Sequence, residues 1–553
     1  MSVLHVSVLN AARRTEKPVV TPGILAPVTV ATVMVLGLAL RLMEAARSYL
    51  NPDEIQYFFF ALPSSFKQLY GSGLLTDHPP LLFFLLHPIA SVTTSEIALR
   101  LIPVLAGTIF PWVVYRWLAR VWTAGAGLAA LVLLTFSPNL ISLSAQVRGY
   151  TLELLFAALA LLFLDTALED RSLRAMILFI ASLDLAVLSE YSAIWFAGAA
   201  GIYFLLRVAL ASGTDRKVST RLVVAWIVGQ LSALALYGAL YWTSIKPRLA
   251  LRDGDIDEYL SDAFPAAHQN LLAFGAIATW KQFAYAFSSA ALGIAAALLF
   301  GVALLILWKG DSPNERTRGR ILAALLVTPF LLACAGALLK LHPYGGSRHT
   351  VILSLFAASG VGIALDGIFR SRLCSNSRGP SSKWIAAFAA LALGLFWIVA
   401  AEPDHGNIAR SRDRRTSMID AVHYLQSSIP PGSVVLADKE TALYLRFYGQ
   451  GPYASGPREL LLQNFDSPAG LPVGHFRVVW RYWDHGEVDD FLQALASVRS
   501  DFKMKPDAPV WVIDGGFYNG IDARLRQRFP GVSLPAFRDF DGALTVFQTP
   551  PGI

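Results

Sequence analysis

The stretch LGIAAALLFGVALLILW, residues 292–308, contains no charged side chain. About 20 apolar residues in a helix are needed to cross the hydrocarbon core of a bilayer, and this run approaches that length. A second run, ILAPVTVATVMVLGLAL at 24–40, has the same character. Because backbone groups in lipid must be hydrogen-bonded within their own segment, such runs are expected to be helices. The sequence therefore predicts a polytopic α-helical membrane protein.

The composition of the 553 residues supports this prediction and excludes other classes. The chain is 55% hydrophobic and 15% charged, with a mean hydropathy of +0.50, whereas soluble domains carry about 25% charged residues. The net charge of +7 comes from basic residues in short loops between apolar runs, a pattern typical of topology determinants. We therefore expect no nucleic-acid partner. Two cysteines, Cys334 and Cys374, allow neither a disulfide framework nor a CxxC metal site.

The apolar runs predict about eleven spans, with boundaries good to a few residues. They are 24–40, 99–118, 124–140, 152–167, 175–188, 192–206, 222–241, 292–308, 321–339, 351–368 and 384–401. Another apolar segment, PPLLFFLLHPIASV at 79–92, is too short to cross comfortably and is interrupted by His87-Pro88. If it crossed, every later loop would change sides.

The positive-inside rule favours a non-crossing 79–92 segment and a cytoplasmic N-terminus. Arg13, Arg14 and Lys17 then share one side with the basic loops near 116–120, 171–174, 216–221, 309–320 and 370–383. The cluster RSRDRR at 410–415 dissents, but it follows the last span, in a larger domain where the rule weakens. The polar loops then meet at the opposite, outer face. These contain Asp53-Glu54, Asp77-His78, Arg148-Tyr150, Glu190-Tyr191, the long loop 243–289 and residues 342–348.

Residues 402–553 have the composition of a soluble domain of ordinary size. SVVLAD, HFRVVWRYW, PVWVIDGG and ALTVFQT predict strands, and three amphipathic helices are predicted between them at 416–428, 487–501 and 521–529. Alternating strands and helices favour a small α/β layer fold on the outer face. It carries no recognisable catalytic motif. The membrane part, 1–401, would hold the site, with a first external loop at 44–98.

The first loop contains NPDEIQYFFF, residues 51–60, in which Asp53 and Glu54 are adjacent. Neighbouring side chains cannot point the same way, so one carboxylate can face a substrate while the other orients or caps. A general base needs such a partly shielded carboxylate; the alternative is a solvated pair of loop acids. Further on, TDHPPLLFF at 76–84 places Asp77 and His78 before two prolines, which hold them rigidly at the start of an apolar helix.

These two motifs together resemble membrane glycosyltransferases of the GT-C type, glycosyltransferase family 39 in the broad sense. In protein O-mannosyltransferases a His-Pro-Pro-Leu string follows a similar acidic pair, and in aminoarabinose lipid A transferases the string has Lys in place of His. LRLIPVLAGTIF at 99–110, AQVRGYTLELL at 145–155 and HPYGGSRHTVILSL at 342–355 are similar to later family motifs. The resemblance covers roughly 24–400; the C-terminal domain matches in type only.

The resemblance implies a GT-C fold in the bacterial cytoplasmic membrane, with the site and the C-terminal domain extracytoplasmic. It implies a polyprenyl-phosphate-linked sugar as donor, a lipid, glycan or protein hydroxyl as acceptor, and inversion at the anomeric carbon. By position, Asp53 becomes the general base, and Glu54 orients it or contacts the acceptor. Asp77 falls where relatives place a carboxylate or another polar residue. Membrane lipids surround the spans.

The phosphate leaving group requires fixed donors, and arginine suits phosphate because its planar group donates two hydrogen bonds. Arg348 and Arg148 are the main candidates, followed by His78 and His349, and Glu190 could enter the donor site. Arg148 could equally snorkel at a helix end. Tyr150 could bind a sugar, but an aromatic-belt position is the favoured interpretation.

Two further hypotheses belong to other classes. A lipid or glycan carrier would favour internal repeats and polar breaks at mid-membrane, whereas here no repeat is found and the polar residues gather at one face. A receptor or scaffold displaying the C-terminal domain would need no such convergence. No cofactor is required by the sequence. The acids and histidines could bind a divalent metal ion, but no ligand spacing compels one.

Overall fold

The computed structural model describes most of the chain, and the statements below apply to these residues. They are 25–62, 65–74, 78–210, 218–249, 260–309, 312–373, 408–448, 470–481, 483, 487–515, 520–530, 532, 537–539 and 544–550. Asp77, the predicted last span at 384–401 and the proposed domain boundary near 401 lie outside them.

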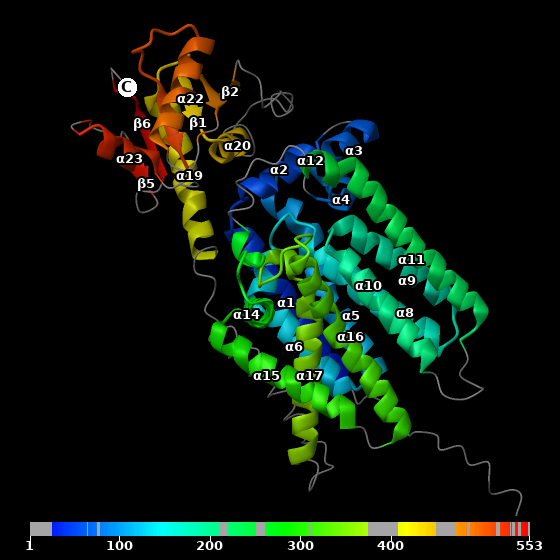
Figure 1. The fold of residues 1–553 in the computed structure, drawn as a ribbon. Helices are drawn as coiled ribbons and strands as arrows, with labels where there is room; N and C mark the ends of the chain where they lie inside the picture. The colour runs from blue at the N-terminus through cyan, green and yellow to red at the C-terminus, as the bar shows by residue number, and fades with distance from the viewer. Residues whose placement is uncertain are drawn as a thin grey trace, which may run out of the picture.

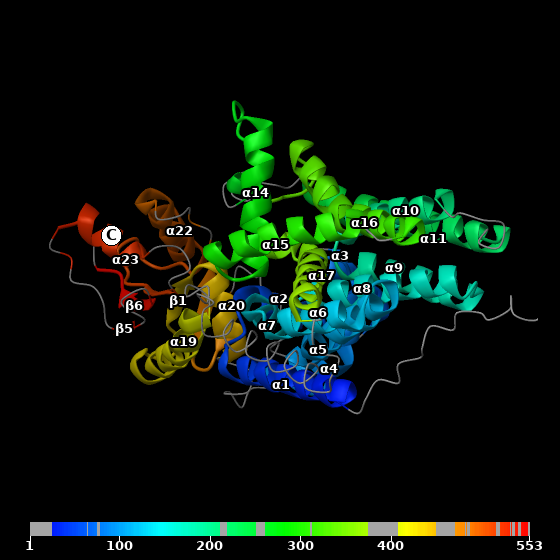
Figure 2. The same cartoon turned by 90° about the horizontal axis from the view of Figure 1, so that it is seen from below.

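The described residues between 25 and 373 form a bundle of helices, and an α/β layer lies beyond one end of it (Figures 1 and 2). In chain order the first helices are α1 (Leu25–Arg47), α2 (Pro52–Phe60), α3 (Phe66–Leu74), α4 (Leu81–Ala90), α5 (Glu96–Val121), α6 (Ala124–Phe136), α7 (Pro138–Ser144) and α8 (Tyr150–Glu169). The later ones are α9 (Leu173–Ser189), α10 (Ala193–Ala209), α11 (Thr220–Leu240), η2 (Tyr241–Ile245), α12 (Lys246–Leu249), η3 (Ser261–Ala263), α14 (Leu271–Ala286), α15 (Ala290–Lys309), α16 (Pro313–Leu338), η4 (Arg348–Thr350) and α17 (Leu353–Leu373).

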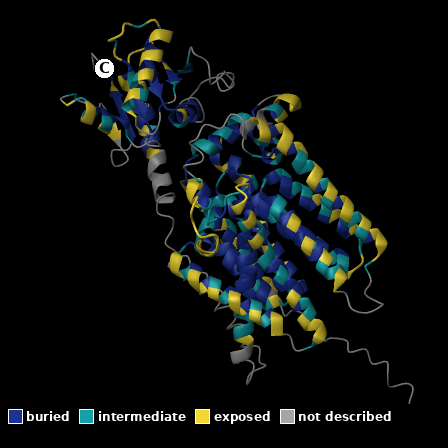
Figure 3. Ribbon diagram, in the orientation of Figure 1, coloured by how far each residue is buried: buried dark blue, intermediate teal, exposed yellow. Residues whose placement is uncertain are grey.

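Each predicted span before residue 374 coincides with a helix or with a bent pair of helices. Seven of the described helices are long and apolar enough to cross a membrane, or eight if one bent pair counts as a span. α4 has 10 residues, about 15 Å of helix, which agrees with a segment that does not cross. Many apolar side chains of α11 and α15 are exposed on the outside of the bundle, where lipid would cover them (Figure 3).

Two predictions about the membrane part were wrong in detail. The span predicted at 124–140 is broken, since α6 and α7 meet at an angle of 62°. Pro138 provides no N–H for the Leu134 carbonyl, and this carbonyl and that of Thr135 accept hydrogen bonds from the buried Arg41. The loop predicted at 243–289 also contains helices, above all α14, which Asn270 caps.

The C-terminal layer is a six-stranded sheet in the order β2-β3-β1-β4-β6-β5. Its elements are α19 (Ile408–Ser428), β1 (Val434–Ala437), α20 (Lys439–Tyr448), β2 (Leu471–Val473), β3 (Phe476–Trp480), α22 (Val488–Asp501), β4 (Trp511–Asp514), α23 (Ile521–Arg528), β5 (Phe537–Asp539) and β6 (Leu544–Gln548). β1 pairs in parallel with β3 and β4, with Val435 opposite Val478 and Trp511. The pairs β2–β3, β4–β6 and β5–β6 are antiparallel. The predicted α/β layer is therefore confirmed.

Candidate active site

The acidic pair lies in the first turn of α2, which begins with a capping box. The Asn51 side chain accepts a hydrogen bond from the Glu54 amide at 3.0 Å, and the Glu54 carboxylate accepts one from the Asn51 amide at 2.9 Å. Pro52 occupies the first helical position, where its missing N–H costs nothing. The sequence NPDE thus starts a helix, and Asp53 faces a different direction from Glu54.

Glu54 is 1% exposed, and both of its oxygens are occupied. Oε1 accepts hydrogen bonds from Arg100 Nε and from the Val147 amide, each at 2.9 Å, and Oε2 accepts one from Arg100 Nη2 at 3.0 Å. Arg100 also donates to the carbonyls of Ala45, Ser48 and Tyr49. Glu54 therefore fastens α2 to α5 and to the segment before α8. This buried position fits the orienting role expected for Glu54 and leaves no oxygen to contact an acceptor.

Asp53 lies between two arginines. Its carboxylate is 2.7 Å from Arg148 Nη2 and 3.4 Å from Arg348 Nη2, and its side chain is 43% exposed. Burial raises the pKa of the Asp53 carboxyl, but Arg148, Arg348 and His78 together outweigh that effect, so its pKa lies below the usual value. Asp53 is thus a carboxylate at neutral pH, within reach of solvent.

Arg148 is buried, and its guanidinium contacts side chains from several different segments. Nη1 lies 3.1 Å from His78 Nε2, and the group stacks over the rings of Tyr57 and Tyr150 at 5.6 and 5.8 Å. The adjacent Gly149 leaves no room for a side chain: a Cβ would lie 2.3 Å from the Ser189 carbonyl oxygen. Two adjacent residues of this segment therefore bind the two adjacent acids: the Val147 amide binds Glu54, and the Arg148 guanidinium binds Asp53.

Glu190 follows α9 and extends the cluster beyond His78. Its Oε2 is 3.7 Å from His78 Nδ1. Its Oε1 is buried and has no hydrogen-bond partner among the described residues. Among the same residues, Arg148 Nε, Arg348 Nε and the Tyr150 hydroxyl are also buried without a partner. Such unsatisfied donors and acceptors are costly in a protein interior and are commonly satisfied by a ligand or water.

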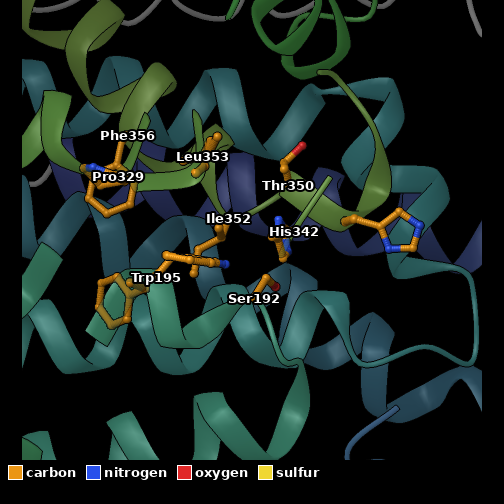
Figure 4. A pocket seen from close by; sticks show the side chains of 11 residues that line it. Ser192, Trp195, Pro329, His342, Thr350, Ile352, Leu353 and Phe356 are labelled. Atoms are coloured by element: carbon orange, nitrogen blue, oxygen red, sulfur yellow. The ribbon is translucent and has the colours of Figure 1, made fainter. Parts of the chain in front are cut away.

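An apolar cavity lies next to the cluster, and His349 is one of its lining residues. Figure 4 shows the cavity with Trp195, His342 and Phe356 among the labelled side chains. The cavity lies between α10, α16 and the start of α17, and Trp195, Phe196, Pro329 and Phe356 are among its lining residues. The His349 ring meets the Tyr150 ring edge to face, with centroids 6.4 Å apart. Burial, and then the charge of Arg348, lowers the pKa of His349 to about 3. His349 is therefore neutral at pH 7 and can offer a hydrogen bond but no charge.

The structure brings together most of the residues that the sequence singled out. Asp53, His78, Arg148, Glu190 and Arg348 form one connected cluster. Tyr150 and His349 lie at its edge, and Glu54 lies behind it. Tyr150 is 1% exposed, so the favoured aromatic-belt interpretation was wrong.

Sequence reasoning missed Arg100, Tyr57 and Gly149. A signal existed for Arg100, because an arginine near the start of a long apolar helix must find an internal partner. Asn51 and Glu54, three residues apart around a proline, also indicated the capping box. The position of Gly149 depends on the approach of residue 189, which no local pattern predicts.

The described residues of the cluster do not fit a divalent metal ion. No group of three or more His, Cys, Asp or Glu side chains suited to a metal exists in the described part of the chain. The one partly exposed carboxylate of the cluster, Asp53, is already neutralised by two guanidinium groups. A dication would have to displace both.

Comparisons with known proteins agree with this architecture. Residues 77–242 match the family model described as dolichyl-phosphate-mannose-protein mannosyltransferase. No curated protein sequence matches the chain. Among solved structures, ArnT from Cupriavidus metallidurans in the apo state is 14% identical with a TM-score of 0.54, over 95% of this chain and 98% of that one. The structure of ArnT from the same organism bound to undecaprenyl phosphate is also 14% identical, with a TM-score of 0.53, over 94% of this chain and 97% of that one.

An oligosaccharyltransferase from Archaeoglobus fulgidus, tethered with an acceptor peptide, is 11% identical with a TM-score of 0.46. That match covers 76% of this chain and 63% of the archaeal one, so this chain spans less than two thirds of that enzyme. The fold match to ArnT, over nearly the whole of both chains, is the informative one. With the family match over 77–242, it confirms the resemblance that the motifs indicated: the chain is similar to the GT-C membrane glycosyltransferases and has their fold.

Proposed function

We propose that the protein is an inverting glycosyltransferase that moves a sugar from a polyprenyl-phosphate donor to an acceptor hydroxyl. The observation that carries the proposal is the position of Asp53 between Arg148 and Arg348. A carboxylate that can accept a proton lies there beside two groups that bind phosphate. The family match and the ArnT-like fold support the same reaction class.

In this reaction Asp53 accepts the proton of the acceptor hydroxyl as its oxygen attacks the anomeric carbon. The bond between that carbon and the phosphate oxygen breaks, and the polyprenyl phosphate leaves with the electron pair. Attack from the face opposite the leaving group inverts the configuration. Arg348 and Arg148 stabilise the charge that develops on the phosphate, because fixed cationic donors are most effective where charge appears. The protonated Asp53 then returns its proton to solvent.

Binding of the donor would raise the pKa of Asp53 and so make it a stronger base. Without a phosphate, both arginines bind the Asp53 carboxylate and lower its pKa, which makes it a weak base. A donor phosphate competes for the same guanidinium groups. Once Arg348 turns to the phosphate, burial again raises the pKa of Asp53, so its basicity increases only when substrate is present.

The donor lipid would approach from the membrane. We place the site and the C-terminal layer at the extracytoplasmic face of a bacterial cytoplasmic membrane. The proposed orientation is supported by Arg120, Arg207 and Arg318, which gather at the opposite end of the bundle, as the positive-inside rule expects of the cytoplasmic side.

The proposal is tested with purified protein in proteoliposomes and radiolabelled polyprenyl-phosphate sugars. Asp53→Asn should lower the transfer rate by about 10²–10⁴-fold, the usual contribution of a general base. Asp170→Asn is the matched control, because Asp170 forms a similar ion pair with Arg120 at the far end of α8. Transfer should remain within about twofold there, since exposed ion pairs contribute little. Full activity of Asp53→Asn would reject the base, and lipid movement without sugar transfer by the native protein would favour a carrier.

A further inference from the structure

The C-terminal layer contacts the bundle at the helix that carries the acidic pair. α20 lies beside α2 in both views (Figures 1 and 2). Tyr444 packs on Tyr49, with ring centroids 5.3 Å apart. Phe447 meets Phe58 edge to face at 5.2 Å. One face of α20 thus covers the chain on both sides of Asp53.

Two further contacts make this interface specific. The Arg446 guanidinium lies over the Phe59 ring, 4.0 Å from its centroid, a favourable arrangement of a cation and an aromatic face. The Leu50 amide donates a hydrogen bond to the Tyr448 hydroxyl at 2.9 Å, and both residues are buried. Leu50 directly precedes Asn51, the capping residue of α2.

The segment before α2 is consequently held from two sides. From the bundle, Arg100 binds the carbonyls of Ala45, Ser48 and Tyr49. From the C-terminal layer, Tyr448 binds the amide of Leu50. A buried amide without a partner carries the full cost of its desolvation, so loss of the Tyr448 hydroxyl would favour a shifted or loosened turn at Leu50. Such a shift is transmitted directly to the start of α2.

We infer that the C-terminal layer positions the base of the active site, and that Tyr448 is the positioning residue. This inference rests on the proposed function for its kinetic consequence, but its structural part does not. Tyr448 contacts no reacting atom in this scheme. It fixes the first turn of α2, so that Asp53 stays opposite Arg148 and Arg348. A displacement of about 1 Å in a reacting group can reduce a rate by about 10²-fold.

The test is Tyr448→Phe in the full-length protein, which removes one hydroxyl and keeps the ring that stacks on Tyr444. Two quantities are measured: hydrogen exchange of the backbone amides in residues 48–60, without substrate, and the kcat and KM for transfer. Exchange near Leu50 should accelerate about tenfold, the factor that corresponds to about 1.4 kcal/mol. The kcat should fall about tenfold or more, while the KM for the donor stays within about twofold. Tyr424→Phe is the matched control, because Tyr424 stacks on Phe537 within the same layer.

The outcomes separate this inference from the proposed function. Unchanged exchange in Tyr448→Phe, or faster exchange with unchanged kcat, overturns the positioning role. If the native protein transfers no sugar yet exchange still accelerates in the variant, the proposed function fails and the contact stands. Should Tyr448→Phe not fold, Phe447→Leu decides instead, because it weakens the packing on Phe58 without removing a hydrogen bond. The same two changes, smaller in size, are then expected.

Discussion

Two networks of arginines and carboxylates lie at opposite ends of α8, and they differ in how completely their polar atoms are used. At the far end, Asp165 Oδ2 accepts from Trp117 at 2.8 Å, and Oδ1 accepts from Tyr203 and Arg207 at 2.7 and 2.9 Å. At the near end, Asp53 is partly exposed, and buried atoms of Arg148, Arg348 and Glu190 have no partner among the described residues. At the far end Arg120 Nε is also buried without a hydrogen-bond partner among the described residues, but it lies 3.2 Å from the Glu169 carboxylate. A carboxylate with both oxygens bound, as in Asp165, holds helices together, whereas the near end has groups available for a substrate.

The largest effects are expected from removing the central acid of each network. Asp165→Asn should lower the free energy of unfolding by about 1.5–3 kcal/mol, because the half-buried Arg207 loses its nearest counter-charge, while kcat below the melting temperature stays within about twofold. Asp53→Asn should lower the transfer rate by about 10²–10⁴-fold, but it should change the free energy of unfolding less than Asp165→Asn does. Thermal unfolding and transfer assays on both variants check this. Loss of kcat in folded Asp165→Asn would remove the distinction between the two ends.

A smaller effect is expected at Gly149, which sets how closely the near-end segments approach. In Gly149→Ala the new Cβ would meet the Ser189 carbonyl oxygen at 2.3 Å and Glu190 Oε1 at 2.8 Å, so Arg148 or Glu190 must move. Transfer should fall by about 10²-fold, as for a misplaced catalytic group. Gly301→Ala is the matched control, since a Cβ there has nothing within 4 Å. Equal activity of the two variants would show that this close approach is dispensable.

The smallest effect is expected from Arg348→Gln, which removes the positive charge beside Asp53 and changes how kcat/KM depends on pH. In the proposed reaction Asp53 must be deprotonated, so activity should be lost as pH falls through the pKa of Asp53. Arg348 helps to lower that pKa; in Arg348→Gln the pKa rises, and the acid limb of kcat/KM should move to higher pH. The value of kcat/KM at its optimum should fall about tenfold, as for one hydrogen bond to a charged group.

Arg370→Gln is the control for that profile, because Arg370 pairs with Asp366 at the other end of α17. Its acid limb should coincide with that of the native protein. An unshifted limb in Arg348→Gln would mean that Asp53 is not the group whose protonation stops transfer.

The same contrast explains how far the sequence alone could go. Helices such as α8, α15 and α17 were predictable, because a long apolar run has few alternatives to a helix in lipid. Four strands of the C-terminal layer, β1, β3, β4 and β6, were predictable from apolar runs bounded by turns. β2 and β5, of three residues each, were missed, because so short a run carries no clear pattern. α20 was missed, because KETALYLRFY mixes aromatic and charged residues and gains its order by packing on α2.

For the candidate site, sequence motifs named the residues but did not indicate which of them are in contact. Asp53, Arg148 and Arg348 were named from three separate loops, and their meeting depends on how α2, α8 and α17 pack. Asp53 and Glu54 differ in position because Arg100 binds Glu54 and not Asp53. Adjacent carboxylates look alike in a sequence. Only their partners, remote in the chain, distinguish the proposed base, Asp53, from the buried Glu54.

Because the chain bends between α6 and α7, the number of residues in α7 determines where the segment that carries Arg148 begins. α7 has seven residues, and residues 147 and 148 come only a few positions after its end. Each residue added to a helix turns the next part of the chain by about 100° and advances it by about 1.5 Å. One insertion in α7 would therefore rotate the Arg148 segment out of phase with α2, whereas in α11, where 17% of the apolar window is buried, an insertion would displace fewer buried side chains. α7 acts as a spacer of fixed length.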